Sequence, residues 1–168
     1  MTIPYLPSFQ WYRDSMERGL PSLRKEKAIN RSLVGISSPT RLTVPLIKGS
    51  GGLISSHGNW QHVHLGTINA IYGRTPYFQH LYPELEEILR NTPEDLATLN
   101  LRLHAMICRW LEPETMEALR SLTPESPNYE ALRQEATRLA TNINFNLSIL
   151  DPLFRFGKNT VLPLVLYK

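Results

Sequence analysis

Residues 59–78 read NWQHVHLGTINAIYGRTPYF, and the spacing of apolar residues in this stretch predicts an amphipathic helix. At about 100° per residue, one face collects the side chains expected to be buried: Trp60, His64, Thr67, Ile68 and Ile71. The opposite side of the same helix carries His62, Gly66 and Asn69. We expect Asn59 to cap the start of this helix and Gly73 to end it in the left-handed conformation.

His64 is the residue on this face that most needs an explanation, because an unpaired buried polar group costs about 1–3 kcal/mol. Two interpretations stay open. His64 is either a core histidine bonded to a backbone carbonyl, or a general base or ligand contact at the wall of a pocket. His62 and His64 lie about 200° apart on a helix and cannot share a metal ion, so we expect no metal site.

Composition limits the classes of function. The chain has 168 residues and a net charge of +3, from 18 basic and 15 acidic residues, which suits one domain over residues 1–168. Its basic residues are scattered, apart from the cluster at 24–27, so we expect no nucleic-acid partner. No apolar run approaches the ~18 residues of a membrane helix, and the first residues do not resemble a signal peptide. With one cysteine, Cys108, the sequence suggests a protein of the reducing cytoplasm.

Local patterns predict short strands early in the chain and helices later. We expect a brief strand or extended segment at 2–6, a helix at 8–18, and a hairpin formed by 33–36 and 41–47. Pro45 lacks an N–H group, so the second hairpin strand should end near it or lie at an edge. Helices are expected near 75–90, 92–113, 129–140 and 151–157. Thr92 and Asp151 are the expected N-caps of two of these helices.

Four blocks of the sequence together resemble a known family. They are Tyr5–Tyr12 (YLPSFQWY), Lys25–Ser32 with Leu42–Pro45 (KEKAINRS and LTVP), His57–Phe78, and Asn146–Asp151 (NLSILD). In this order they resemble the bacterial WbqC-like proteins, which occur among genes for surface polysaccharide and O-antigen sugars. About a dozen residues that usually form another strand in that family are missing before Asn30, where Gly19–Pro21 bridges the gap. Ser32 stands where the family often has cysteine, so no thiol nucleophile carries over.

The resemblance implies a fold and an activity. The fold is α/β of the α+β kind, with a small mixed sheet from the N-terminal half packed by four to five helices from the C-terminal half. The activity is transfer of an acyl or aminoacyl group onto an amino sugar or sugar nucleotide in the assembly of surface polysaccharide. The sequence identifies no cofactor, and the oligomeric state stays open.

Under this enzyme hypothesis, each candidate residue has a role. His64 is the general base, and Thr67, one turn further on the same face, orients the substrate or the ring. Asn30 and Arg31 hold a sugar-nucleotide or carboxylate oxygen, and Lys25 adds a second positive charge. Asp151 pairs with His64 or Arg31. The last candidate for substrate contact is Tyr72.

The competing hypothesis is a non-catalytic binding or scaffold protein that associates with sugar-modifying enzymes. The shortened N-terminal half favours this alternative. Geometry separates the two classes, because a catalytic set of His64, Arg31 and Asp151 must converge within about 8 Å on an open cleft.

Overall fold

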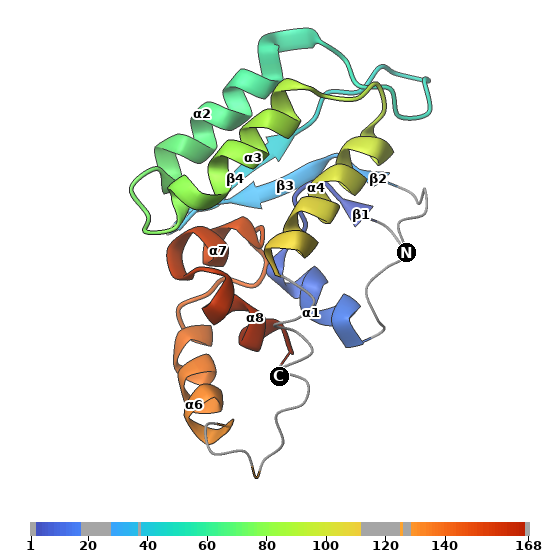
Figure 1. The fold of residues 1–168 in the computed structure, drawn as a ribbon. Helices are drawn as coiled ribbons and strands as arrows, with labels where there is room; N and C mark the ends of the chain where they lie inside the picture. Colours follow the sequence, from blue (N-terminus) through green and yellow to red (C-terminus); the bar gives the residue numbers. More distant parts are fainter. Residues whose placement is uncertain (1–2, 18–27, 37, 112–124, 126–128, 167–168) are drawn as a thin grey trace.

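The described strands lie in the N-terminal part of the chain, and most of the helices follow them in sequence (Figure 1). The computed structural model describes residues 3–17, 28–36, 38–111, 125 and 129–166. The described strands are β1 (Ile3–Pro4), β2 (Ala28–Ile29), β3 (Arg31–Val34) and β4 (Thr40–Thr43). The described α-helices are α1 (Phe9–Glu17), α2 (Trp60–Tyr72), α3 (Phe78–Arg90), α4 (Leu96–Trp110), α6 (Tyr129–Ala140), α7 (Leu150–Phe156) and α8 (Lys158–Leu166). This arrangement confirms the expected α+β class.

The strands make two pairs, one parallel and one antiparallel. β1 pairs with β2 in parallel, whereas β3 and β4 form the expected hairpin, with Arg31 opposite Thr43 and Leu33 opposite Arg41. Alternate residues of a strand point to opposite faces, and the buried face of this hairpin consists of Ser32, Val34 and Leu42. β4 ends before Pro45, as expected for a residue without an N–H group.

In helix α2, the buried face is the one predicted, but the two ends differ from the predicted caps. Its buried residues are Trp60, His64, Leu65, Ile68 and Tyr72, while Thr67 and Ile71 are partly buried. Asn59 has φ 49° and its side chain makes no capping hydrogen bond, because a 3-10 turn over His57–Asn59 leads directly into the helix. Gly73 is right-handed, with φ −57°, and its N–H donates to the Asn69 carbonyl. Both cap predictions were therefore wrong, although the helix does end at this point.

Two other helices, α4 and α7, are capped by residues other than the ones predicted. The cap of α4 is Asp95, whose carboxylate accepts from the Thr98 N–H at 3.0 Å, and the Thr92 hydroxyl instead donates to the Leu89 carbonyl. Asp151 lies inside the first turn of α7, after the N-cap Ile149. Its carboxylate is therefore free to bind a side chain rather than the helix backbone.

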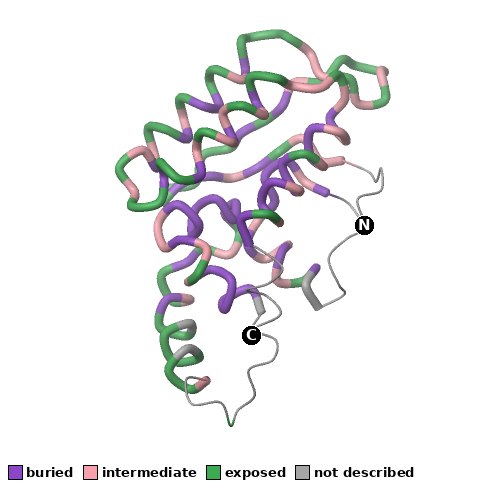
Figure 2. The backbone as a smooth tube through the Cα atoms, in the orientation of Figure 1, coloured by how far each residue is buried: buried purple, intermediate pink, exposed green. Residues whose placement is uncertain are grey.

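One continuous hydrophobic core joins the hairpin to the helices. Helix α3 packs against α2, α4 and α7, and α8 packs against α1, α6 and α7. Figure 2 shows buried positions gathered where these elements meet, whereas α6 is mostly exposed. The Tyr72 hydroxyl ties α2 to the end of β3, because it donates to the Gly35 carbonyl at 2.8 Å and accepts from the Gly35 N–H at 2.9 Å.

Candidate functional site

Three segments that are distant in the sequence meet at the edge of the hairpin and enclose a cleft of about 280 Å³. They are residues 4–8, 29–33 and 146–148, joined on one side by Arg41 of β4. Backbone hydrogen bonds fix the segments to one another, from the Ser148 N–H to the Leu33 carbonyl at 2.7 Å and from the Ile149 N–H to the Pro7 carbonyl at 2.9 Å. Backbone hydrogen bonds therefore fix the positions of the segments that form the walls of this cleft.

Two arginines form one end of the cleft. Arg31 and Arg41 are both exposed and lie on the outer face of the hairpin. Because Arg31 is opposite Thr43 and Arg41 is opposite Leu33, the two arginines are diagonal neighbours, a relation that puts side chains about 7–8 Å apart. Among the described residues, neither arginine makes an ion pair with a carboxylate. Both positive charges are thus available to an anion in the cleft.

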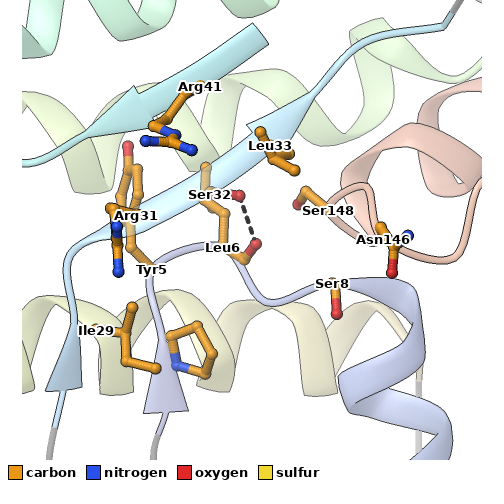
Figure 3. A pocket seen from close by; sticks show the side chains of 11 residues that line it. Tyr5, Leu6, Ser8, Ile29, Arg31, Ser32, Leu33, Arg41, Asn146 and Ser148 are labelled. Atoms are coloured by element: carbon orange, nitrogen blue, oxygen red, sulfur yellow. Dashed lines mark hydrogen bonds between the residues drawn. The ribbon is translucent and has the colours of Figure 1, made fainter. Parts of the chain in front are cut away.

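Hydroxyl and amide groups lie at the other end, as Figure 3 shows. Asn146 is exposed there, and Ser8 is partly buried. The Ser8 Oγ accepts from the Trp11 N–H at 3.1 Å and caps α1, which leaves its O–H group able to donate. Ser148 is fully buried in the floor, where its Oγ accepts from the Leu150 N–H at 3.3 Å.

The backbone of the cleft is strained at Leu6. This residue has φ 44°, in the left-handed region that a leucine rarely adopts. The Ser32 hydroxyl holds it in place by donating to the Leu6 carbonyl at 2.8 Å (Figure 3). Such strain costs of order 1–3 kcal/mol and clusters at functional sites, so it supports the choice of this cleft.

His64 lies in the core, not on the open surface. The Tyr5 hydroxyl is 2.9 Å from His64 Nδ1, within hydrogen-bond distance. The Trp60 ring packs edge-on against it, with the ring centroids 5.1 Å apart. Burial lowers the pKa of His64 to about 4, and the backbone of Thr43 partly offsets this shift. The geometry thus favours the core-histidine interpretation, and Tyr5 contacts both His64 and the cleft.

Asp151 and Tyr72 also have partners within the fold. The fully buried Asp151 carboxylate accepts two hydrogen bonds from Arg155, at 3.0 and 2.7 Å. Burial raises the pKa of Asp151, and the Arg155 guanidinium and the Tyr72 hydroxyl oppose that shift. The partner of Asp151 is therefore Arg155, not His64 or Arg31, because an arginine four residues later on α7 lies on the same helix face.

Two further candidates, Asn30 and Thr67, do not line the cleft. The Asn30 side chain donates to the Val44 carbonyl at 2.9 Å and closes the open end of the hairpin. The Thr67 hydroxyl donates to the Val63 carbonyl within α2. Lys25 lies outside the described residues. Among the candidates that the structure describes, only Arg31 lines the cleft, and the other lining residues had not been selected from the sequence.

One protein-family model matches most of this chain. The model of the WbqC-like protein family matches residues 21–135, more than half of the chain. The chain belongs to the WbqC-like family. No curated protein and no solved structure matches it. Two of the four blocks that carried the resemblance, Tyr5–Tyr12 and Asn146–Asp151, lie outside the matched range of this WbqC-like chain, yet both contribute to the cleft.

Those blocks were the signal for the cleft residues that sequence reasoning missed. Ser8, Asn146 and Ser148 all belong to them, and Arg41 directly precedes another block. Elsewhere, the described residues contain no cluster of three or more metal-ligating side chains. Every helix in the described part of the chain is too short or too polar to cross a lipid bilayer.

Proposed function

We propose that this WbqC-like protein binds an anionic sugar derivative, such as a sugar phosphate or sugar nucleotide, in the cleft between Arg31 and Asn146. The observation that carries the proposal is the pair of arginines without carboxylate partners among the described residues, opposite a hydroxyl and an amide. A guanidinium binds phosphate or carboxylate through a planar pair of donors, and sugar hydroxyls suit the serine and asparagine groups. The volume of about 280 Å³ fits a single sugar ring with its anionic group.

The reaction that we propose for the bound sugar is acyl or aminoacyl transfer in surface polysaccharide assembly. The amine of an amino sugar would attack the carbonyl of an activated acyl donor, form the amide, lose its proton to a base and release the leaving group of the donor. Family membership supports this hypothesis. His64 would take part as base only through the Tyr5 hydroxyl, because Tyr5 bonds to the imidazole and lines the cleft.

A non-catalytic binding protein that works beside sugar-modifying enzymes is the second candidate. The enclosure of His64 and Asp151 favours it, because neither group reaches a bound substrate directly. As a binding protein, this candidate uses the same anionic sugar ligand, whereas as a scaffold it needs no ligand in the cleft.

Binding is tested by calorimetric titration with N-acetylglucosamine 1-phosphate and its uridine diphosphate derivative. Arg31→Ala and Arg41→Ala should each weaken binding by roughly 1.5–3 kcal/mol, the range for hydrogen bonds to charged groups. Arg31→Lys should recover part of the loss, since an ammonium group lacks the planar donor pair. Arg102→Ala removes an exposed arginine of α4 outside the cleft and serves as the matched control. Equal affinities in Arg41→Ala and Arg102→Ala would refute the site.

Transfer is tested separately, by mass spectrometry of glucosamine 1-phosphate incubated with a thioester donor such as acetyl coenzyme A. An amide product that disappears in His64→Gln, with sugar binding retained, would support the transferase, because a general base acts in the transition state. Sugar binding without any product in the wild type would favour the binding protein.

A further inference from the structure

A second cavity, of about 420 Å³, lies where the start of α3, the end of α4 and the junction of α7 with α8 meet. No described residue lines both this cavity and the cleft. Three aromatic residues contribute to its walls: Tyr77, Trp110 and Phe156. Its volume is within the range of about 300–1,000 Å³ that is common for small-molecule sites.

The aromatic walls are held in place by specific contacts. Gly157 has φ 80°, and a Cβ atom at this position would lie 2.7 Å from the Tyr77 ring, so the ring rests directly on the glycine backbone. The Tyr77 N–H also donates to the Phe154 carbonyl at 3.1 Å. On the other side, the Trp110 Nε1–H donates to Glu84 at 2.7 Å.

Tyr77 is nevertheless open to a ligand. It is 41% exposed, and its hydroxyl makes no hydrogen bond within the described part of the chain. An exposed ring with a fixed orientation is a suitable stacking surface for a planar group.

Two cationic residues, Arg109 and Lys158, contribute to the lining. None of the lining residues in the described part of the chain carries a carboxylate. Arg109 is oriented by an ion pair with Glu84, the residue that also fixes Trp110. A ligand for this cavity therefore combines a planar aromatic group with a negative charge.

We propose that this cavity is a nucleotide site, in which the base stacks on Tyr77 and the phosphate contacts Lys158 and Arg109. This site is separate from the sugar cleft and does not depend on the function proposed for it. Nucleotides have both required features, a π-face that stacks on any aromatic ring and a phosphate that binds cationic side chains.

The test uses AMP and the indole N–H resonances of the three tryptophans in a ¹H–¹⁵N spectrum of the full chain. Trp110→Phe assigns the Trp110 resonance, which should move on addition of AMP. Tyr77→Ala should weaken AMP binding about tenfold, the loss expected when a stacking ring is removed. Tyr77→Phe keeps the ring and should bind AMP as the wild type does. Lys158→Gln should also weaken binding, whereas the control Gln79→Ala, an exposed residue of α3 outside the lining, should not.

Any of four results would overturn the proposal. The first is a Trp110 resonance that AMP does not move. The second is an affinity for AMP that is the same in Tyr77→Ala and Gln79→Ala. The third is equal binding of inorganic phosphate and AMP, which would reduce the cavity to a simple anion site. Arg41→Ala should leave AMP binding here unchanged, and loss of the Trp110 shift in that variant would instead assign AMP to the sugar cleft.

Discussion

Two buried histidines should make this protein sensitive to mild acid. His64 is bonded to Tyr5, and His104 is bonded in the same way to Tyr12, with 2.9 Å between the hydroxyl and Nδ1 in each pair. Burial lowers the pKa of each histidine from 6.5 to about 4. Because the unfolded chain takes up these protons at a higher pH than the folded chain does, stability is full above pH 6.5 and falls as the pH drops toward 4.

The magnitude follows from these values. At pH 5, an unfolded histidine with a pKa of 6.5 is mostly protonated and a folded one with a pKa near 4 is not, a difference of about 2 kcal/mol for each residue. The two histidines together should thus remove about 4 kcal/mol between pH 7 and pH 5, a large part of the 5–15 kcal/mol typical of a domain. Asp151 acts in the opposite direction because its pKa is raised, but it is common to all the variants compared.

The assay is urea unfolding at pH 7, 6 and 5, followed by circular dichroism. His64→Gln and His104→Gln should each cut the loss of unfolding free energy between pH 7 and pH 5 by about half, whatever their stability at pH 7. His62→Gln is the matched control, because His62 is exposed on the same helix as His64. An unfolding free energy of the wild type that is equal at pH 7 and pH 5 would refute the reasoning. The reasoning would also be refuted if the loss of unfolding free energy between pH 7 and pH 5 were as small in His62→Gln as in His64→Gln.

Three further predictions concern the core. Trp60→Ala should lower the unfolding free energy in urea by about 3–5 kcal/mol because the indole is buried beside His64, and an unchanged midpoint would contradict its placement. Arg155→Ala should cost about 3–5 kcal/mol in the same assay because it leaves a buried carboxylate unpaired, and Asp151→Leu combined with Arg155→Met should restore much of that loss. Cys108 should react slowly with a thiol reagent in the native protein at neutral pH, since burial raises its pKa to about 11, and rapid labelling would disprove this.

The sequence predicted the helices and strands better than it predicted the residues at which they begin and end. The face of α2 was predictable because a period near 3.6 depends only on the order of apolar residues. Its caps were not, because Asn59 takes its conformation from the preceding 3-10 turn, which the local sequence does not reveal. In the same way, Asp95 caps α4 in place of Thr92, and only the folded chain shows which of the two precedes the first helical residue.

The candidate site was also predicted only in part, because its residues come from segments that are far apart in the sequence. Arg31 was selected because it precedes a hairpin, but its neighbour Arg41 was missed, since the pairing of Leu33 with Arg41 depends on a register that the sequence leaves undetermined. Ser8 and Asn146 lie 138 positions apart in numbering and meet only because backbone bonds join the segments around Pro7 and Ser148. No local pattern contains that contact.

The polar residues that looked most reactive in the sequence have partners in the fold. His64 bonds to Tyr5, and Asp151 bonds to Arg155, so each satisfies a buried group that would otherwise destabilise the core. By contrast, the arginines of the cleft have no carboxylate partner in the described chain, and unsatisfied cations at a surface are available to a ligand at no structural cost. The case for function therefore rests on Arg31 and Arg41 more than on His64. A catalytic role for His64 requires that Tyr5, which bonds to His64 and lines the cleft, carry the proton between them.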